Sequence, residues 1–368
     1  MPSTNLLGEI TAKLAEGFLR LMRPSGAIED PVTKICDARP TAEAGKSFLK
    51  LGLKEAAEKC FRWTLQQQGA NGSWHEITED FDEENTLSTA VIGKSLLDAY
   101  LLHPKKEYIA AAQKALYYVL GKEFSPGYFL KARSHYPDML NVNAACAAFM
   151  TAMLHVKDDS TVRAARDRAI FNVVRHQFKD GALPYTSSER LFPYEDHLNV
   201  RDFYYHAVTL YYLSHSDPCL ENEYFQTAAP KAFNWLSSAM NATRVPWHIS
   251  KVIFAVGAVG FYGYAAYCFK EHKDDHRFQK CISRLQMLQR TDGLFSRYEP
   301  SKLGDFVRGC FGELFELNAI APTSYSTATR LFRLRKRLAH ELKNRRKQIP
   351  SAFYSAQVFN ALTECIRP

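Results

Sequence analysis

The chain repeats one pattern six times. A helix-length apolar segment ends in a turn, an aromatic residue follows, and a second helix-length segment rich in small residues begins. The six aromatic markers lie 55, 56, 62, 51 and 56 residues apart, at Trp74, Phe129, Tyr185, Trp247, Tyr298 and Tyr354. A period in this range is long enough for one helical hairpin with its loops, and stacked hairpins bury a continuous core. The sequence therefore predicts a ring of helical hairpins.

The two helices of each predicted hairpin differ in how apolar they are. The first helices are amphipathic and are expected at residues 51–68, 105–123, 160–179, 222–240, 277–289 and 327–347. The second helices are apolar nearly all round and are expected at residues 86–100, 140–156, 200–214, 249–269, 305–320 and 351–365. Helices of the second kind must be buried on most of their circumference. We therefore predict an all-α fold, an (α/α)6 toroid, or barrel, with an inner and an outer ring.

The turns after three outer helices share a phrase, from Gln67 to Trp74, from Gln177 to Tyr185 and from Gln289 to Tyr298, with a glycine just past the helix end. Glycine accepts the left-handed backbone that ends a helix. The spacing of Gln67, Gly72 and Trp74 resembles the QW-type repeat of α/α-toroid proteins, which include terpene cyclases and protein prenyltransferases. Similar toroids serve uronate-processing hydrolases, sugar epimerases, polysaccharide lyases and exopolysaccharide-biosynthesis proteins. The resemblance covers about residues 50 to 368 and implies the toroid fold, but a fold does not fix a function.

The repeat runs to the end of the 368-residue chain without a linker rich in Pro, Gly or Ser, so residues 50–368 are expected to form one barrel domain. Residues 1–49 are expected to hold an amphipathic helix, Leu6 to Met22, and a connecting segment. That helix is predicted to cap the far end of the barrel, to lie on a membrane or to contact a partner chain. The sequence shows neither an apolar run of roughly 18 residues nor a secretory signal, which favours a cytoplasmic location, with a membrane-peripheral one as the alternative.

The net charge of +8 is concentrated in one segment. Between Arg330 and Lys347, nine Lys or Arg residues accompany a single acid, Glu341. We predict that this segment is the sixth outer helix, with a basic face that is either solvated or attracted to an acidic polymer or an anionic membrane surface. Nucleic acid is a less favoured partner because no stacking platform or reader motif accompanies the charge.

Eight cysteines are scattered without a Cys-x-x-Cys pair, and several fall in apolar helical runs. A disulfide framework or a structural zinc site would need clustered ligands, so buried reduced thiols are expected. The sequence predicts no metal and no cofactor.

All loops that lead from an outer helix to an inner helix are expected to meet at one end of the barrel, which we call the mouth. The N-termini of the inner helices converge there, and their positive dipole ends favour anionic ligands. Carboxylate, amide and guanidinium groups bind the polar groups of sugars, and Trp and Tyr faces stack on pyranose rings. The polar and aromatic residues of these loops therefore predict a saccharide or another small anionic molecule as substrate.

Hydrolysis of a glycosidic link needs two carboxyl groups across the scissile bond, one protonated and one ionised. We predict that one acid of the first loop faces one of the third loop, and that His, Tyr and Arg act instead if the reaction is proton removal from a uronic acid. The predicted catalytic residues are Asp82, Glu83, Glu84, Asp196, Asp202, His197 and His206. The predicted substrate-binding residues are Trp74, His75, Arg133, His135, Tyr136, Asn141, Tyr185, Tyr194, Arg201, Tyr205, Trp247, His248, Arg297, Tyr298 and Arg308.

The sequence thus predicts an enzyme that acts on an acidic, uronate-containing oligo- or polysaccharide, with hydrolysis preferred over lyase or epimerase chemistry. Two alternatives stay open. The segment Asp80-Phe81-Asp82-Glu83 resembles the Asp-x-Asp-Asp motif of class II terpene cyclases, in which one Asp is the strong acid that protonates an alkene. A toroid of this kind could also bind a glycan or a partner protein without catalysis.

Overall fold

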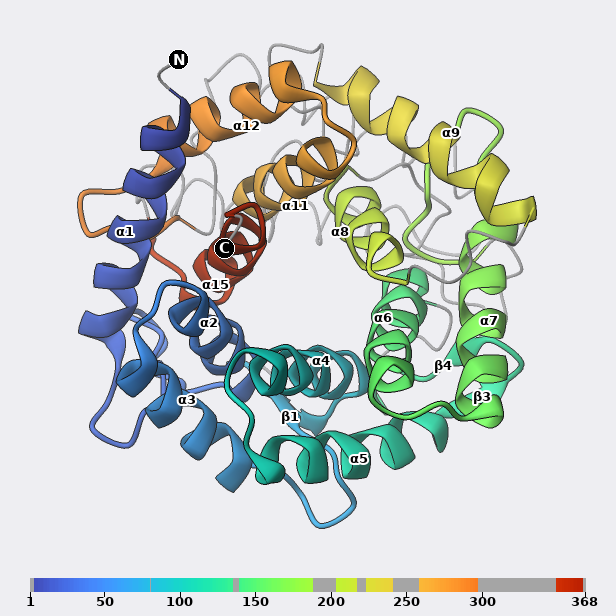
Figure 1. Cartoon of the computed structure of the whole chain (residues 1–368), viewed down its shortest axis with the longest axis horizontal. Helices are drawn as coiled ribbons and strands as arrows, with labels where there is room; N and C mark the ends of the chain where they lie inside the picture. Colours follow the sequence, from blue (N-terminus) through green and yellow to red (C-terminus); the bar gives the residue numbers. More distant parts are fainter. Residues whose placement is uncertain are drawn as a thin grey trace, which may run out of the picture.

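The computed structural model describes residues 3–79, 81–134, 139–187, 203–216, 223–240, 258–296 and 349–366. Within these residues, a closed inner ring is formed by α2 (Ala38–Lys50), α4 (Thr86–Leu102), α6 (Leu140–Val156), α8 (Phe203–Ser214), α11 (Ala258–Glu271) and α15 (Ala352–Glu364). Each inner helix packs against the next, and α15 packs against α2 (Figure 1). The outer ring holds α1 (Ser3–Leu21), α3 (Lys54–Gln66), α5 (Lys106–Leu120), α7 (Ser160–Arg175), α9 (Glu223–Ala239) and α12 (Asp275–Leu288). The predicted (α/α)6 toroid is confirmed.

The N-terminal residues belong to the two rings themselves. The amphipathic helix α1 lies in the outer ring, where Ile10, Leu14 and Phe18 are buried, and it packs against α12 and α15 rather than capping the far end of the barrel. Helix α2 lies in the inner ring between α15 and α4. The division expected at residue 50 therefore does not separate an appended segment from the barrel.

Helix α2 did not match the sequence pattern of an inner helix because three of its buried residues are charged. Arg39, Glu43 and Lys46 are only 3%, 1% and 2% exposed. Such side chains are rarely buried unless they are paired, and their partners cannot be read from the local sequence. Two further expected helices lie outside the described residues, at 305–320 and 327–347. The basic segment from Arg330 to Lys347 lies within the second of these ranges.

One turn is repeated around the ring. In five described links between an outer and an inner helix, a buried residue two positions after a glycine donates its backbone N–H to a side chain of the inner helix. The pairs are Ile28 with Thr41, Trp74 with Thr89, Phe129 with Asn143, Leu183 with His206 and Phe295 with Ser355, at 2.9 to 3.1 Å. At Gly72, φ is +91° and a Cβ would lie 2.3 Å from the carbonyl oxygen of Lys114 in the next outer helix, so only glycine fits. The repeat identifies α1 and α2 as a hairpin like the others.

Glutamines reinforce three of these turns. The side-chain amide of Gln177 donates to the carbonyl oxygens of Gly181 and of Ala228 in the next outer helix, both at 2.9 Å. Gln68 and Gln289 make equivalent pairs of bonds. In the first turn the bonded residue is thus Gln68 rather than Gln67 of the predicted motif. Each glutamine joins two neighbouring hairpins, which explains why the phrase recurs in the sequence.

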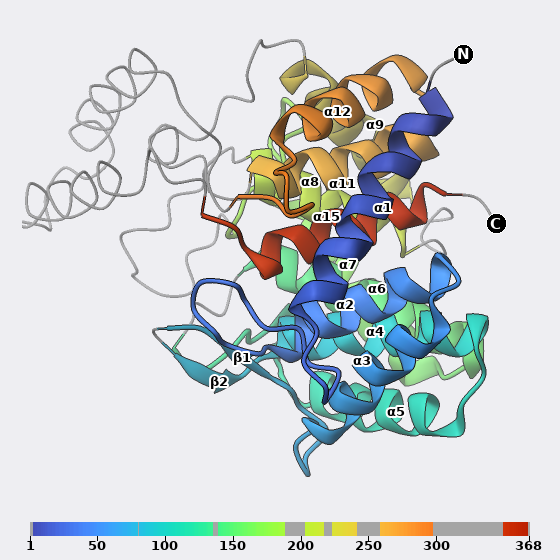
Figure 2. The ribbon, with the colours of Figure 1, turned by 90° about the vertical axis from the view of Figure 1, so that its left-hand side faces the viewer.

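Two of the outer-to-inner links contain short antiparallel hairpins. Strand β1 (His75–Ile77) pairs with β2 (Asp82–Glu84), and β3 (Glu123–Ser125) pairs with β4 (Tyr128–Phe129). Figure 2 shows β1 and β2 at one end of the barrel, beside the link between α1 and α2. This end, where the inner helices begin, is the mouth. None of the described helices is both long and apolar enough to cross a membrane.

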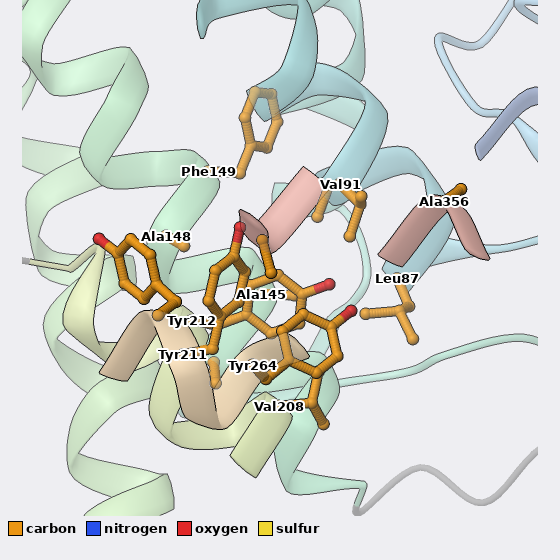
Figure 3. Close-up of a cluster of buried hydrophobic side chains, with 14 of the residues drawn as sticks. Leu87, Val91, Ala145, Ala148, Phe149, Val208, Tyr211, Tyr212, Tyr264 and Ala356 are labelled. Carbon is orange, nitrogen blue, oxygen red and sulfur yellow. The ribbon is translucent and has the colours of Figure 1, made fainter. Parts of the chain in front are cut away.

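Below the mouth, the axis of the barrel is a packed core. Tyr211 and Tyr212 of α8 and Tyr264 of α11 fill it among small aliphatic side chains of the other inner helices (Figure 3). The three tyrosines are 2%, 3% and 0% exposed. Side chains therefore fill the axis of the barrel below the mouth.

A buried charge cluster holds the far end of the axis. Lys46 Nζ lies 2.5 Å from Glu364 Oε1 and 3.1 Å from Asp98 Oδ2. Lys94 also binds Asp98, at 2.8 Å, and His215 lies 3.0 Å from Glu364. Because these residues come from α2, α4, α15 and the end of α8, the cluster fixes four segments of the inner ring to one another.

Candidate functional site at the mouth

The β1–β2 hairpin separates the predicted acids into two groups. Its register places Glu76 opposite Glu83 and His75 opposite Glu84. Since directly opposed residues share a face and successive residues alternate, Glu76 and Glu83 lie on one face of the hairpin. His75, Asp82 and Glu84 lie on the other.

The face with Glu83 contacts the loop between α5 and α6. Glu83 Oε2 accepts a hydrogen bond of 3.1 Å from the backbone N–H of Ser134. Glu76 Oε2 lies 3.1 Å from Lys131 Nζ and also accepts from the side-chain amide of Asn85, the N-cap of α4. Glu76 was not among the predicted site residues, because strand register, rather than composition, brings it beside Glu83.

The opposite face is more exposed. His75 Nδ1 lies 2.6 Å from Asp82 Oδ1, and these side chains are 47% and 62% exposed. Glu84 accepts from the side-chain amide of Asn71 at 2.7 Å. A strong alkene-protonating acid needs a protected environment, which Asp82 does not have. Asp80, the first acid of the cyclase-like segment, lies outside the described residues.

Half-buried aromatic side chains line the beginning of α8 and α15. Tyr185 stacks on Tyr205 with ring centroids 3.8 Å apart, and Tyr205 meets Tyr204 edge-on at 5.2 Å. Tyr204 meets Tyr354 at 6.4 Å, and Tyr354 meets Phe353 at 5.3 Å. We call these five residues the aromatic arc. It includes the predicted binding residues Tyr185 and Tyr205 and adds three that the sequence analysis did not select.

Charged groups at the start of α2 lie beside the arc. The guanidinium carbon of Arg39 lies 5.0 Å from the centre of the Phe353 ring, and Arg39 Nη2 donates to the Tyr212 hydroxyl at 3.3 Å. Asp37 caps α2 and accepts from the backbone N–H groups of Arg39 and Ile77, at 2.7 and 2.8 Å. Burial raises the pKa of Asp37 to about 7. Both residues were missed because the segment before residue 50 was not assigned to the barrel.

Two of the predicted site residues, Trp74 and His206, are buried and make hydrogen bonds within the fold. Trp74 is fully buried, and its indole N–H donates to the carbonyl oxygen of Thr64 at 2.8 Å. His206 Nδ1 accepts from Leu183 N–H at 2.9 Å, while Nε2 donates to the carbonyl oxygen of Ala232 at 3.0 Å. Burial lowers the pKa of His206 to about 3, so the ring is neutral. These contacts support structural roles for both residues in place of the predicted catalytic and binding roles.

The remaining predicted residues divide into described and undescribed positions. Arg133 is exposed on the rim. Asn141, in the first turn of α6, is 6% exposed, and its side-chain oxygen has no hydrogen-bond partner within the described part of the chain. The other predicted site residues lie outside the described residues, and they are Asp196, Asp202, His197, His135, Tyr136, Tyr194, Arg201, Trp247, His248, Arg297, Tyr298 and Arg308. Their roles remain predictions.

Within the described part of the chain, no three His, Cys, Asp or Glu side chains are grouped so that they could hold a metal ion. Six cysteines in that part are free thiols, and five of them are buried.

Comparisons with known proteins give no relative by sequence but several by structure. No family model and no curated protein matches the chain. An alpha-amylase from Clostridium perfringens is 12% identical with a TM-score of 0.61, over 97% of each chain. An alpha-1,6-mannanase from Salegentibacter sp. HEL1_6 is 11% identical with a TM-score of 0.61, over 80% of this chain and 94% of that chain. A cellobiose 2-epimerase from Spirochaeta thermophila DSM 6192 is 14% identical with a TM-score of 0.60, over 87% and 99%.

At these identities the likeness concerns the fold. The similarity to the mannanase, the amylase and the epimerase extends over most of the chain and includes both rings. The predicted resemblance is thereby confirmed at the level of architecture, and the chain is an (α/α)6 toroid.

Proposed function

We propose that the protein is a carbohydrate-processing enzyme that binds an oligo- or polysaccharide at the mouth of the barrel. The observation that carries this proposal is the aromatic arc. Tyr185, Tyr205, Tyr204, Tyr354 and Phe353 form a continuous series of half-buried rings where two inner helices begin. Aromatic faces of this kind stack on the apolar sides of sugar rings, while their hydroxyl groups bond to sugar hydroxyls. The fold likeness to a mannanase, an amylase and a sugar epimerase supports the same class of substrate.

Our preferred reaction is hydrolysis of a glycosidic link, with Glu83 as one of the two carboxyl groups. The hydrogen bond from Ser134 N–H favours the ionised form of Glu83. An ionised carboxylate either attacks the anomeric carbon or removes a proton from the attacking water. The protonated acid that gives its proton to the leaving oxygen would then come from the third loop, from Asp196 or Asp202. The sugar gains the water oxygen, and the leaving sugar gains a proton.

The predicted substrate remains an acidic, uronate-containing saccharide. The N-termini of inner helices point toward the mouth and favour negative charge there. Epimerisation is the second candidate reaction, because the cellobiose 2-epimerase shares the fold over 87% of this chain. The two reactions differ in product, since hydrolysis shortens the saccharide and epimerisation does not.

The test is turnover of a panel of neutral and uronate-containing oligosaccharides, with the products separated by chromatography. Glu83→Gln should lower the rate about 100- to 10,000-fold, as expected for the loss of an acid–base or nucleophilic group. Glu79→Gln is the matched control, because Glu79 is an exposed acid of the same link. The proposal fails if no saccharide is bound or converted by the wild type. The role of Glu83 fails if Glu83→Gln turns over substrate as fast as Glu79→Gln.

A further inference from the structure

A buried amide below the aromatic arc lacks part of its hydrogen bonding. Gln357, on α15, is 1% exposed. Its Oε1 accepts from the Tyr204 hydroxyl at 2.9 Å, but its Nε2 has no acceptor among the described residues. Buried polar groups nearly always have a hydrogen-bond partner. A side-chain amide without an acceptor beneath a binding surface therefore indicates a place for an acceptor from a ligand.

A guanidinium group lies on the same side of α15. Arg39 is 3% exposed and lies over Phe353, which is one helical turn before Gln357 and therefore on the same face of the helix. Arg39 has five N–H donors in a planar fork. Its guanidinium donates to the Tyr212 hydroxyl at 3.3 Å, lies over the Phe353 ring and lies 3.7 Å from a carboxylate oxygen of Glu43, and Asp37 is a second acid close enough to interact with it.

Glu43 is an acid of the protein itself that would compete with a ligand carboxylate for the positive charge of Arg39. Its nearest oxygen is 3.7 Å from Arg39 Nε, which is longer than a charge-assisted hydrogen bond. Burial raises the pKa of Glu43, and the positive charges of Arg39 and Lys46 oppose that rise. Arg39 Nε is buried without a hydrogen-bond partner in the described structure, and α2 and α15 both direct their N-terminal ends toward the same region.

We propose that Arg39 and Gln357 form a carboxylate-binding subsite beneath the aromatic arc, which selects uronate-containing saccharides over neutral ones. A sugar ring bound at the aromatic arc would direct its C6 carboxylate toward the guanidinium fork and the amide N–H groups. A neutral hexose has one hydroxyl there in place of two charged oxygens. This inference rests on the proposed function and adds the residues that recognise the carboxylate of the sugar.

The test measures binding of trisaccharides of glucuronate, galacturonate and mannuronate by isothermal titration calorimetry, each beside its methyl ester. Esterification removes the charge and retains the ring. The wild type should bind at least one acid about tenfold more tightly than its ester, as expected for a charge-assisted contact. Arg39→Gln and Gln357→Glu should each abolish this preference while the ester binds as before. Gln113→Glu, which adds the same charge at an exposed position of α5, should leave the preference intact.

The outcomes separate this inference from the proposed function. If acid and ester bind equally, or if the preference persists in Gln357→Glu, the subsite does not exist, and any binding seen in the same titrations still supports the proposed function. If neutral saccharides are converted and no uronate binds, the inference is overturned and the proposed function stands. If no saccharide of either kind binds or is converted, the proposed function itself fails. Should Arg39→Gln not fold, as judged by circular dichroism, Gln357→Glu alone decides the result.

Discussion

The hydroxyl of Tyr204 donates a 2.9 Å hydrogen bond to Oε1 of Gln357, and the two side chains meet in front of Gly260. They come from α8 and α15, which are separated in the inner ring by α11. A Cβ on Gly260 would lie 2.8 Å from the Tyr204 ring and 2.9 Å from Gln357 Oε1. The absence of a side chain at this one position of α11 thus allows the aromatic arc to continue from α8 to α15.

Gly260→Ala should weaken saccharide binding about tenfold, because the added methyl group displaces Tyr204 and Gln357 from each other and breaks the arc. Titration with the best saccharide of the panel measures this. Gly8→Ala is the control, since a Cβ there has nothing within 4 Å. Unchanged affinity in Gly260→Ala would show that the arc is not the binding surface.

Gly72→Ala should destabilise the fold far more than Gly52→Ala. Both glycines have positive φ, +91° and +77°, but only at Gly72 would the Cβ meet a backbone carbonyl, 2.3 Å away. Left-handed backbone costs a non-glycine residue about 1–2 kcal/mol, which is the expected loss for Gly52→Ala. The loss for Gly72→Ala should be at least about twice that, because a close contact with backbone adds to it. Urea unfolding gives both values, and equal losses would contradict the repeated turn described above.

His206→Asn should make stability less sensitive to acid. The folded-state pKa of His206, about 3, lies below the ordinary histidine pKa of 6.5, so only the unfolded chain takes up this proton between the two values. The contribution of His206 is therefore complete above pH 6.5 and declines as the pH falls toward 3, by about 1.4 kcal/mol per pH unit. Asparagine retains an acceptor for Leu183 N–H, as Asn143 does for Phe129.

The measurement for this variant is the free energy of unfolding between pH 7 and pH 4. The slope should be smaller in His206→Asn than in the wild type. His155→Asn, at an exposed position of α6, serves as the control and should keep the wild-type slope. An identical slope in all three proteins would mean that His206 is not the buried neutral group described here.

Lys46→Met should destabilise the protein by about 3–5 kcal/mol, because it leaves the buried Glu364 and the partly buried Asp98 as charges with fewer partners. Burial opposes ionisation of Asp98, but Lys94 and Lys46 lower its pKa to about 2. The stability that Asp98 contributes is present above its ordinary pKa and is lost as the pH falls toward 2. Denaturant unfolding of Lys46→Met beside Lys106→Met, an exposed lysine of α5, checks this, and a loss as small as the control's would contradict it.

The sequence predicted the toroid fold but did not predict its first hairpin, which consists of α1 and α2. Apolar periodicity located α4, α6, α8 and α11 because these helices are buried through apolar side chains. Helix α2 is buried with Arg39, Glu43 and Lys46, and the partner of Lys46 is Glu364, 318 residues away. Pairing over such a distance leaves no local pattern.

The same limit applies to the candidate site. The density of acids in the first loop pointed to Glu83, but only the strand register shows that Glu76 shares its face and that Asp82 and Glu84 do not. His206 matched the composition of an active site, whereas its contacts with Leu183 and Ala232 are those of a repeated structural turn. Arg39 and Gln357 were missed because only their contacts with side chains from other helices distinguish them, and the local sequence does not show these contacts.

The inner ring closes where α15 meets α2, and Thr363 donates to the hydroxyl of Ser47 across 316 residues of sequence. During synthesis, α2 leaves the ribosome long before the helix that completes its environment exists. One side of α2 therefore stays uncovered through most of translation. Folding of the ring becomes fully cooperative only when α15, the last of the twelve described ring helices, has been synthesised.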